Sequence, residues 1–233
     1  VGGLTLGGGI GWLTRTHGLT CDNLIAADLV TADGQIVQAT AAATPDLFWA
    51  LRGGGGNFGV VTRFEFALHP VGPVVTAGAM VYPPERGAEV LSAWEEFRKQ
   101  APEELNTMVY MQRTAHWEMY PEEVRGREAY ILSSCSLLGL DETRAVLAPM
   151  RELQPRFELF GPMPYAALQT LTDNDFPFGS RTYARGHRLA TLGAGAIEVI
   201  VDYCRRRPKT GSRMYVEHME GAVRRLGEEA TAF

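Results

Sequence analysis

The sequence is poor in cysteine, histidine and lysine, and each shortage argues against a class of protein. Its three cysteines, Cys21, Cys135 and Cys204, are odd in number and far apart, so we expect buried thiols and neither a disulfide framework nor a CxxC metal site. The five histidines form no HExxH motif and no closely spaced pair, which argues against a zinc site. Lys99 and Lys209 are the only lysines, so motifs that require a catalytic lysine have few candidates.

Long apolar runs and basic stripes are also missing. The apolar runs are far shorter than the roughly 20 residues that span a bilayer, so no membrane partner is expected. Acidic residues (27) outnumber basic ones (22) and the one basic run is Arg205–Arg207, so no nucleic-acid partner is expected. The sequence begins at Val1 with no visible secretory signal, so it does not determine the compartment. The oligomeric state is also undetermined.

Glycine is abundant but unevenly distributed, because half of the 26 glycines lie in the first sixty residues. This stretch needs close backbone approach or positive φ at many positions. Within it, Thr44 is typical of a helix N-cap, with Pro45 at the first helical position. The region is predicted to contain strand 24–31, turn 32–34, strand 35–39, a helix that ends at Gly53, and strand 60–68.

Beyond Pro70–Pro73 the composition shifts, because glycine thins out and amphipathic helices begin. A helix opened by Asp141 is expected to kink or end at Pro149. The pattern predicts helical stripes within 90–101 and 197–204 and strands near 105–111, 129–136 and 213–219. We therefore expect an α+β fold in two domains, 1–72 and 73–233, the second an antiparallel sheet with helices on one face.

The strongest local feature is the polyglycine run Gly53–Gly56 followed by Asn57-Phe58-Gly59-Val60-Val61. It satisfies both GxGxxG and the kinase pattern GxGxxGxV. A helix precedes it and a strand follows, however, which is the reverse of the dinucleotide context, and no HRD or DFG motif occurs. A tight connection needs only one or two glycines, and each further one costs roughly 0.5–1 kcal/mol. The run therefore favours a bare backbone surface for a flat ring or a phosphate.

The second feature is the run from Val1 to Trp12, in which Leu4 and Leu6 alternate with Thr5 and predict a short strand before a glycine-rich bend. A packed bend and a ligand loop both fit this pattern. No Lys followed by Ser or Thr completes a phosphate P-loop. The whole sequence also lacks GxSxG, so a hydrolase nucleophile is not indicated.

Together, "VGGLTLGGGIGWLTRTHGLTCDNLIAADLVTADGQIV" and "DLFWALRGGGGNFGVVTRFEFALHPVG" resemble FAD-linked oxidases of the berberine bridge enzyme type, with the flavin-binding domain of the p-cresol methylhydroxylase and vanillyl-alcohol oxidase class. A looser resemblance extends to "FPFGSRTYARGHRL" and "SRMYVEHMEGAVRRLGEEATAF". It implies that 1–72 is the later part of an FAD-binding domain and 73–233 a truncated substrate-binding domain. The family's N-terminal subdomain, with its covalent flavin histidine, and its C-terminal segment would lie outside the chain. We expect the chain alone to bind FAD weakly and to be inactive.

The resemblance also implies residue roles toward FAD, because glycine backbones can donate N–H groups to a ring or phosphate without steric hindrance. Three segments match the family's flavin-lining loop, its following turn and its second lining segment. The implied cofactor-binding residues are Gly2, Gly3, Gly7, Gly8, Gly9 and Gly11; Gly18, Asp22 and Asn23; and Asn57, Gly59, Val60 and Val61.

Two groups are candidates on the substrate side. In strand 213–219, Tyr215 and Glu217 share one face by alternation while His218 faces the other way. The resemblance places this strand over the flavin, so Glu217 is a candidate general base; the alternative is a solvated or ion-paired residue. Arg181, Tyr183 and Arg185 could orient a polar or acidic substrate, or could simply form a solvated face.

The resemblance implies an enzyme that oxidises an alcohol, sugar or amine-bearing small molecule. Its substrate hydride would go to FAD, and O2 would reoxidise the flavin to give hydrogen peroxide. One alternative is a non-catalytic flavin- or ligand-binding module that descends from such an oxidase. Another is an NAD-dependent dehydrogenase, which the context of the GxGxxG match disfavours.

Overall fold

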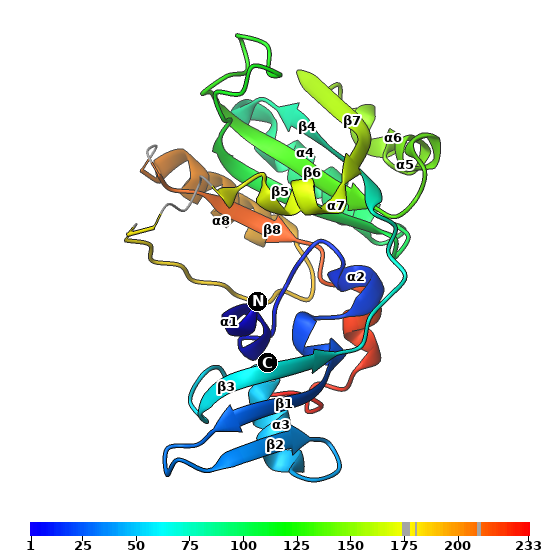
Figure 1. The fold of residues 1–233 in the computed structure, drawn as a ribbon. Coiled ribbons are helices and arrows are strands. Elements are labelled where there is room, and N and C mark those ends of the chain that lie inside the picture. Colours follow the sequence, from blue (N-terminus) through cyan, green and yellow to red (C-terminus); the bar gives the residue numbers. More distant parts are fainter. Residues whose placement is uncertain (174–177, 180, 209–210) are drawn as a thin grey trace. The chain divides into compact units, whose positions relative to one another are not determined.

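A computed structural model describes residues 1–173, 178–179, 181–208 and 211–233. The chain divides into two compact units, which we call the first unit and the second unit (Figure 1). The first consists of Val1–Val71 together with Met219–Phe233, and the second of Gly72–His218. Residues 219–233 therefore pack with the N-terminal segment, whereas the division expected from the sequence grouped them with the second domain. The roles assigned to the two domains stay predictions.

The first unit contains an antiparallel sheet in the order β2-β1-β3. Its strands are β1 (Leu24–Val30), β2 (Ile36–Thr40) and β3 (Val60–Phe66), and α3 (Pro45–Leu51) packs on it. Leu29, Phe48 and Leu51 form the centre of this core. The predicted strands, turn and helix are confirmed. Thr44 is the N-cap residue, but its hydroxyl bonds to the carbonyl of Gln38 and not to the helix.

The expected strand at Leu4–Leu6 is wrong, because Gly2–Leu6 forms the helix α1. The Thr5 amide and hydroxyl both donate to the Val1 carbonyl, at 2.9 and 3.0 Å, which closes a helical turn. Leu6 packs on the core while Leu4 is 54% exposed, so the two leucines do not share a face as they would in a strand. Short elements follow: α2 (Thr14–His17) and the 3-10 helix η1 (Thr20–Asn23), with η4 (Gly221–Arg225) near the C-terminal end.

The second unit contains a five-stranded antiparallel sheet in the order β7-β4-β6-β5-β8. The predicted strands near 105, 129 and 213 are confirmed. The sequence pattern missed β4 and β7, because Gly78 interrupts the first and two prolines interrupt the second. The strands are β4 (Val74–Tyr82), β5 (Leu105–Arg113), β6 (Glu128–Ser136), β7 (Phe157–Pro164) and β8 (Met214–Glu217).

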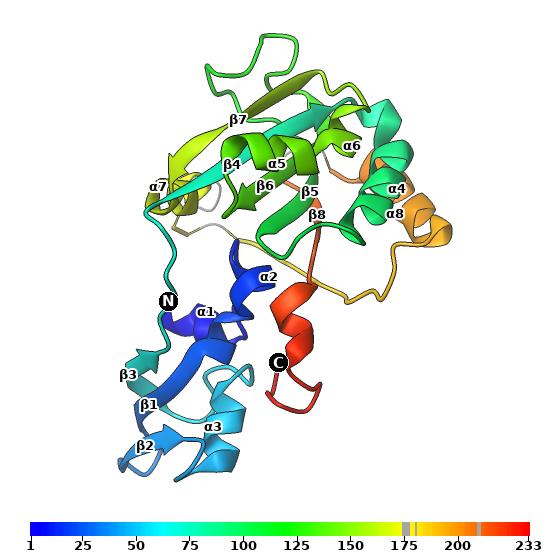
Figure 2. The same cartoon turned by 90° about the vertical axis from the view of Figure 1, so that its right-hand side faces the viewer.

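Helices cover one face of this sheet. In Figure 2, α4 (Gly87–Arg98) and α8 (Ala194–Arg206) lie side by side, and both contribute to the main core cluster. The predicted helical stripes are confirmed, since Trp94 and Val201 are buried in that cluster. The break expected at Pro149 is also confirmed, because α5 (Leu140–Val146) gives way to α6 (Ala148–Arg151), with η2 (Pro84–Arg86) and α7 (Tyr165–Thr170) completing the unit.

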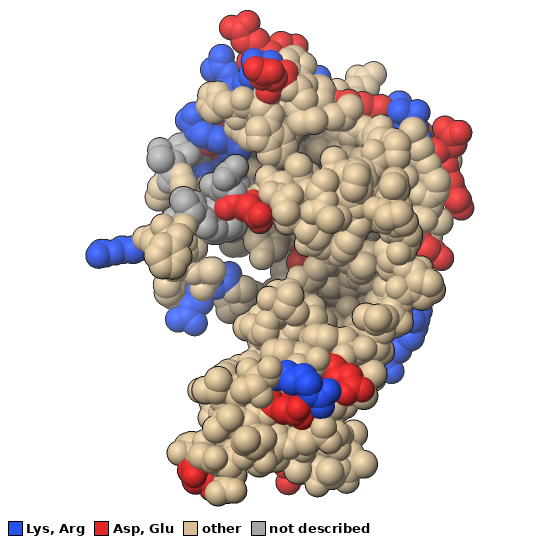
Figure 3. All heavy atoms as spheres, in the orientation of Figure 1, with Lys and Arg blue, Asp and Glu red and all other residues tan. Residues whose placement is uncertain are grey.

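The α+β class with antiparallel sheets is confirmed. In the part of the chain that the structure describes, no helix is both long and apolar enough to cross a membrane. On the face drawn in Figure 3, acidic and basic side chains are interspersed, and the described residues there form no large patch of one sign.

Candidate functional site

The two glycine-rich segments of the first unit lie against each other. The Gly55 amide donates to the Leu6 carbonyl at 2.8 Å, which joins the polyglycine turn to the end of α1. The amides of Thr20 and Cys21 donate to the carbonyls of Gly9 and Gly8, at 2.8 and 2.9 Å, which fixes the glycine loop against η1. Residues separated by some fifty positions in the sequence thus form one backbone surface.

Many of these glycines are required by the chain's own packing. A Cβ on Gly9 would lie 2.5 Å from the Thr20 side chain, and one on Gly54 would lie 2.5 Å from the Ala50 carbonyl oxygen. A Cβ on Gly59 would lie 2.5 Å from the Val30 carbonyl oxygen. These contacts are closer than real Cβ atoms tolerate, so the fold alone explains glycine at these three positions.

Three other glycines face open space. A Cβ on Gly3, Gly11 or Gly56 would meet no atom of the chain within 4 Å. None of the three has positive φ, so neither packing nor backbone conformation requires glycine there. A bare surface that the chain itself does not fill is what a flat ring or a phosphate needs. These glycines therefore form the best candidate for a cofactor contact in the first unit.

The side chains of Asp22 and Asn23 are used by the protein itself. Asp22 Oδ2 accepts a hydrogen bond from the Leu19 amide at 2.8 Å, and Oδ1 lies 3.6 Å from Arg52. Asn23 Nδ2 donates to the carbonyls of His17 and Leu19, at 3.0 and 2.8 Å. Both side chains stabilise the turn, which is a structural role that needs no cofactor.

The remaining matched residues differ in how they are used. A Cβ on Gly18 would lie 2.8 Å from an Asp22 carboxylate oxygen, so Gly18 belongs to the same turn. Asn57 donates to the Gly54 carbonyl at 3.0 Å and so stabilises the polyglycine turn. Val60 is 71% exposed, whereas Val61 packs on the core.

Tyr215 and Glu217 lie on the face of the second unit's sheet opposite the main helical core, which we call the Glu217 face. Strand pairing places Glu217 opposite Met108 and Tyr215 opposite Tyr110. Val216 points the other way and packs on the helical core. The prediction that Tyr215 and Glu217 share a face is confirmed. The row through Glu217 contains Met108, Ser133, Ala79 and Leu159.

Glu217 has an unusual environment for a carboxylate. Its Oε1 is buried and has no hydrogen-bond partner among the described residues. Burial raises the pKa of Glu217 to about 7, because a low-dielectric environment disfavours the charged form. No ion pair to Glu217 occurs among the described residues, and the choice between a general base and a solvated or ion-paired residue stays a prediction. A carboxyl group that titrates near neutrality can accept a proton at physiological pH.

The neighbours of Glu217 divide between the two faces. Tyr215 is 53% exposed and its ring centroid lies 5.5 Å from that of Tyr110, which gives the face an aromatic pair. His218 is 1% exposed and its ring meets Trp94 edge-on at 6.2 Å, within the helical side of the unit. The expectation that His218 faces away from Glu217 is therefore confirmed.

Of the predicted substrate group, the structure brings two residues together. Arg185 Nε donates to the Tyr183 hydroxyl at 2.6 Å, and its guanidinium lies over the Tyr183 ring at 5.4 Å. Arg181 and Tyr183 are both exposed, in a segment without regular structure. Asn174–Pro177 and Ser180, which include part of the matched sequence, lie outside the described residues. A role in substrate binding stays a prediction.

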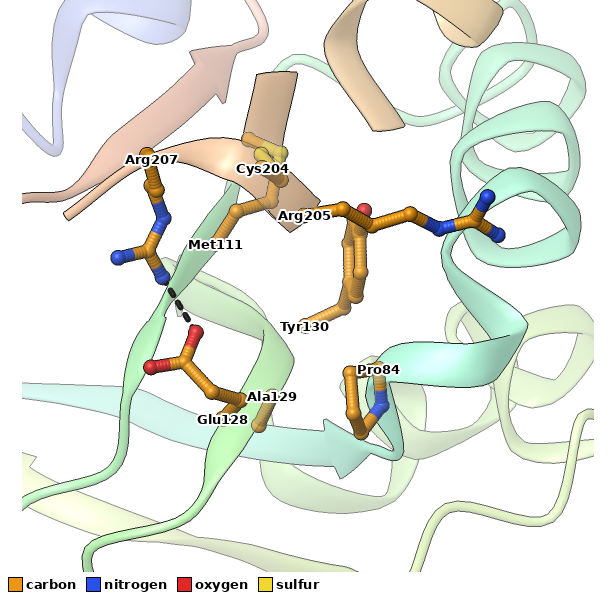
Figure 4. A pocket seen from close by; sticks show the side chains of 8 residues that line it. All are labelled: Pro84, Met111, Glu128, Ala129, Tyr130, Cys204, Arg205 and Arg207. Carbon is orange, nitrogen blue, oxygen red and sulfur yellow. Dashed lines mark hydrogen bonds and ion pairs between the residues drawn. The ribbon is translucent and has the colours of Figure 1, made fainter. Parts of the chain in front are cut away.

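A cavity of about 220 Å³ lies at the helical side of the second unit, bounded in part by Met111, Tyr130 and Cys204 (Figure 4). Sequence patterns did not reveal its buried ion pair, in which Arg207, with a side chain only 1% exposed, meets Glu128 at 2.6 Å. Because Glu128 already neutralises Arg207, the Glu217 face is the better candidate site. Among the described residues, no three His, Cys, Asp or Glu side chains are grouped to hold a metal ion.

Comparisons with known proteins identify relatives along the whole chain. Residues 1–40 match the family model described as an FAD binding domain. The chain is 35% identical over 234 residues to an FAD-linked oxidoreductase of Dictyostelium discoideum, covering 98% of this chain and 48% of that protein. It is 40% identical over 124 residues to the glucooligosaccharide oxidase of Sarocladium strictum, covering 51% of this chain and 24% of that protein.

The same similarity is found among solved structures. The structure of Physcomitrella patens BBE-like 1 matches 100% of this chain and 51% of that chain, with a TM-score of 0.78 at 22% identity, which supports the fold. The chain spans about half the length of the relatives that match it over its whole length. Agreement in fold with a BBE-like protein and sequence similarity along the chain lead to one conclusion: the chain belongs to the FAD-linked oxidoreductases.

Proposed function

We propose that the protein containing this chain is an FAD-dependent oxidase that acts on an alcohol, a sugar or an amine-bearing small molecule. The observation that carries this proposal is the half-buried Glu217, whose Oε1 is buried without a described partner and whose pKa is raised to about 7. Burying an unpaired carboxylate is costly, and such groups are concentrated at functional sites. Its neighbour Tyr215 adds an exposed hydroxyl on the same face.

FAD fits the bare backbone surface of the first unit. Gly3, Gly11 and Gly56 would offer backbone contacts without a side chain in the way. When bound, FAD would supply the redox chemistry, taking a hydride from the substrate and passing electrons to O2 to give hydrogen peroxide. The full proposed set of cofactor contacts is Gly2, Gly3, Gly7, Gly8, Gly9, Gly11, Gly18, Asp22, Asn23, Asn57, Gly59, Val60 and Val61.

The chain's own contribution to the reaction would be proton transfer and orientation. Above pH 7, Glu217 would be largely ionised and would take the proton of a substrate hydroxyl or amine. Burial strengthens this carboxylate as a base, because protonation relieves the unfavourable buried charge. The Tyr215 hydroxyl would orient the substrate by a hydrogen bond.

A sugar is the substrate class with the most support. The name of the Sarocladium strictum relative specifies a glucooligosaccharide. The Tyr110 and Tyr215 rings lie on the same face as Glu217 and offer flat apolar surfaces of the kind on which a sugar ring can rest. Tyr183 and Arg185 could orient the rest of a polar substrate.

The test is Glu217→Gln, introduced into the full natural reading frame that contains this chain. The amide keeps the size and polarity of the side chain but cannot act as a base, so the rate of anaerobic flavin reduction by substrate should fall by about 10²–10⁴. Glu158→Gln is the matched control, because Glu158 lies on the same sheet but pairs with Arg151 at 2.8 Å. A rate for Glu217→Gln within about threefold of the control would favour a non-catalytic flavin- or ligand-binding module.

We also propose that residues 1–233 alone hold FAD weakly and do not turn over substrate. Each charge-assisted hydrogen bond to a phosphate contributes roughly 1.5–3 kcal/mol, and the N-terminal subdomain expected from the resemblance, which would add such bonds, lies outside residues 1–233. The experiment compares residues 1–233 with the full natural reading frame after incubation with FAD and gel filtration. A stoichiometric yellow chain of residues 1–233 that forms peroxide would contradict this proposal.

A further inference from the structure

The last residues of the chain are bonded to the segment that leads into the polyglycine turn. Trp49 Nε1 donates to the Glu229 carbonyl at 2.8 Å, from the exposed side of α3. Arg52 donates through Nη1 to the Ala230 carbonyl at 3.2 Å, and the Ala232 amide donates to the Arg52 carbonyl at 3.1 Å. We call residues 229–233 the C-terminal brace.

Phe233 occupies the space that two glycines leave empty. A Cβ on Gly8 would lie 2.2 Å from the Phe233 ring, and one on Gly53 would lie 2.3 Å from the Phe233 amide nitrogen. Both glycines have positive φ, at +101° and +126°. One belongs to the N-terminal glycine loop and the other to the polyglycine turn. A single residue therefore packs on both halves of the backbone surface.

Arg52 connects the C-terminal brace to the same loop by a second route. Its Nε donates to the Cys21 carbonyl at 3.0 Å, and the Cys21 amide donates to the Gly8 carbonyl. Its guanidinium also lies near Asp22 and over the Phe48 ring at 5.5 Å. Arg52 thus fixes residue 230 and the partner of Gly8 at once, which a shorter side chain could not do.

The glycines that Phe233 covers differ from those that remain open. Gly8 and Gly53 are filled by Phe233, whereas a Cβ on Gly3, Gly11 or Gly56 would still meet no atom of the chain. A residue that blocked the cofactor surface would cover the open set as well. Phe233 therefore supports the cofactor surface and does not block it.

We infer that the C-terminal brace holds the Gly7–Gly9 loop against the polyglycine turn, and that Phe233 is a positioning residue for the FAD surface. The part of this inference that concerns FAD rests on the proposed function. The part that concerns the two glycine segments does not, because it needs no cofactor. The two parts are therefore tested by separate measurements.

The first measurement is amide hydrogen exchange in residues 1–233 without FAD. The Cys21 and Gly55 amides report on the two glycine segments, because they bond to Gly8 and Leu6. Phe233→Ala should speed exchange at both by about tenfold, since it removes the shared packing. Phe233→Leu, which keeps an apolar side chain, should restore most of the protection. Phe178→Ala, at a fully exposed phenylalanine, is the matched control.

A second variant removes the brace's anchor without touching Phe233. Trp49→Phe deletes the bond to Glu229 and should speed exchange at the same two amides by about threefold. Exchange at the Leu132 amide in the second unit should stay unchanged, which separates a local effect from global unfolding. Unchanged exchange at Cys21 and Gly55 in both variants would overturn the brace.

The second measurement is FAD affinity in the full natural reading frame. Phe233→Ala should weaken FAD binding by about tenfold while Phe233→Leu stays close to the parent. Tighter FAD binding by Phe233→Ala would show that Phe233 blocks the cofactor surface, and unchanged FAD binding would remove the positioning role. Either result overturns this part of the inference. A parent protein that binds no FAD would refute the proposed function, while hydrogen exchange would still decide whether the brace exists.

Discussion

The two units offer contrasting candidate surfaces. In the first unit the surface is backbone, with Gly3, Gly11 and Gly56 open to a ligand. In the second unit it consists of side chains, Tyr215 and Glu217, on one face of a sheet. A backbone surface is lost when a side chain is added, whereas a side-chain site is lost when a side chain is changed. The first unit can therefore be tested by adding side chains at its glycines, and the second by changing the side chains of Tyr215 and Glu217.

The largest effect is expected where an added side chain collides with the fold. Gly9→Val places a Cβ 2.5 Å from Thr20 at a φ of +87°, so both packing and backbone conformation are violated. We expect the first unit to lose about 3 kcal/mol or more of its free energy of unfolding. Thermal unfolding followed by circular dichroism measures this loss. A variant that melts with the parent would show that the close approach to Thr20 does not exist.

Gly56→Val should separate binding from folding within the same glycine-rich region. Its Cβ meets no atom of the chain, so the melting temperature should change by only a few degrees. In the full natural reading frame, however, the added isopropyl group should collide with the cofactor and abolish flavin retention. Gly8→Val should lose flavin for a different reason, because its side chain displaces Phe233. A folded, fully yellow Gly56→Val protein would remove the open glycines from the proposed site.

In the second unit, Glu217→Gln should raise stability at high pH. The folded-state pKa of about 7 lies above the ordinary value of 4.5, so the folded state binds more protons between these values and unfolding becomes easier as pH rises. Gln lacks this penalty, and at pH 8 it should be more stable than the parent by on the order of 2 kcal/mol. The two proteins should converge near pH 4. Urea unfolding at both pH values tests this, and equal stability at pH 8 would mean that Glu217 is not desolvated.

A smaller effect is expected at Asp22, a candidate cofactor-binding residue of the first unit that has a functional side chain. Asp22→Ala removes the acceptor of the Leu19 amide and the partner of Arg52. The free energy of unfolding should fall by about 1–2 kcal/mol. FAD affinity should fall only as far as this destabilisation explains. A large loss of affinity at unchanged stability would instead indicate direct contact with the cofactor.

The smallest effect on the fold is expected at Tyr215, which is 53% exposed. Tyr215→Phe should change the free energy of unfolding by less than about 0.5 kcal/mol. If the hydroxyl orients the substrate in the ground state, KM should rise severalfold while kcat changes less. Steady-state kinetics separate the two parameters. A loss confined to kcat would assign the hydroxyl to the transition state.

The sequence predicted elements best where the periodicity was long and undisturbed. The stripes of α4 and α8 are regular enough to define both type and face, and the apolar run in β6 defines its type. β4 and β7 were missed because Gly78 and the prolines of β7 lower strand propensity. The structure shows why Gly78 is tolerated there: a Cβ would lie 2.2 Å from the Leu159 carbonyl oxygen of the neighbouring strand. Tertiary packing overrides local preference at that position.

The candidate site was predictable in kind but not in detail. Glycine spacing indicated a backbone surface, and alternation placed Tyr215 and Glu217 on one face. Sequence patterns could not separate Gly9, which the fold requires, from Gly56, which it does not, because both are simply glycines in glycine-rich runs. They also could not indicate Arg52, since no pattern links it to Ala230 across 178 positions.

The membership of residues 219–233 in the first unit has a consequence for the order of folding. The second unit is contiguous in sequence, and its sheet can be completed during synthesis once Glu217 has left the ribosome. The first unit is interrupted by the whole of the second, and its glycine segments gain the packing of Phe233 only when the ribosome has reached that residue. Such long-range closure is slow compared with local pairing. On the ribosome, the five-stranded sheet would therefore form before the glycine segments gain their packing against Phe233, and the surface proposed for FAD would mature after that sheet.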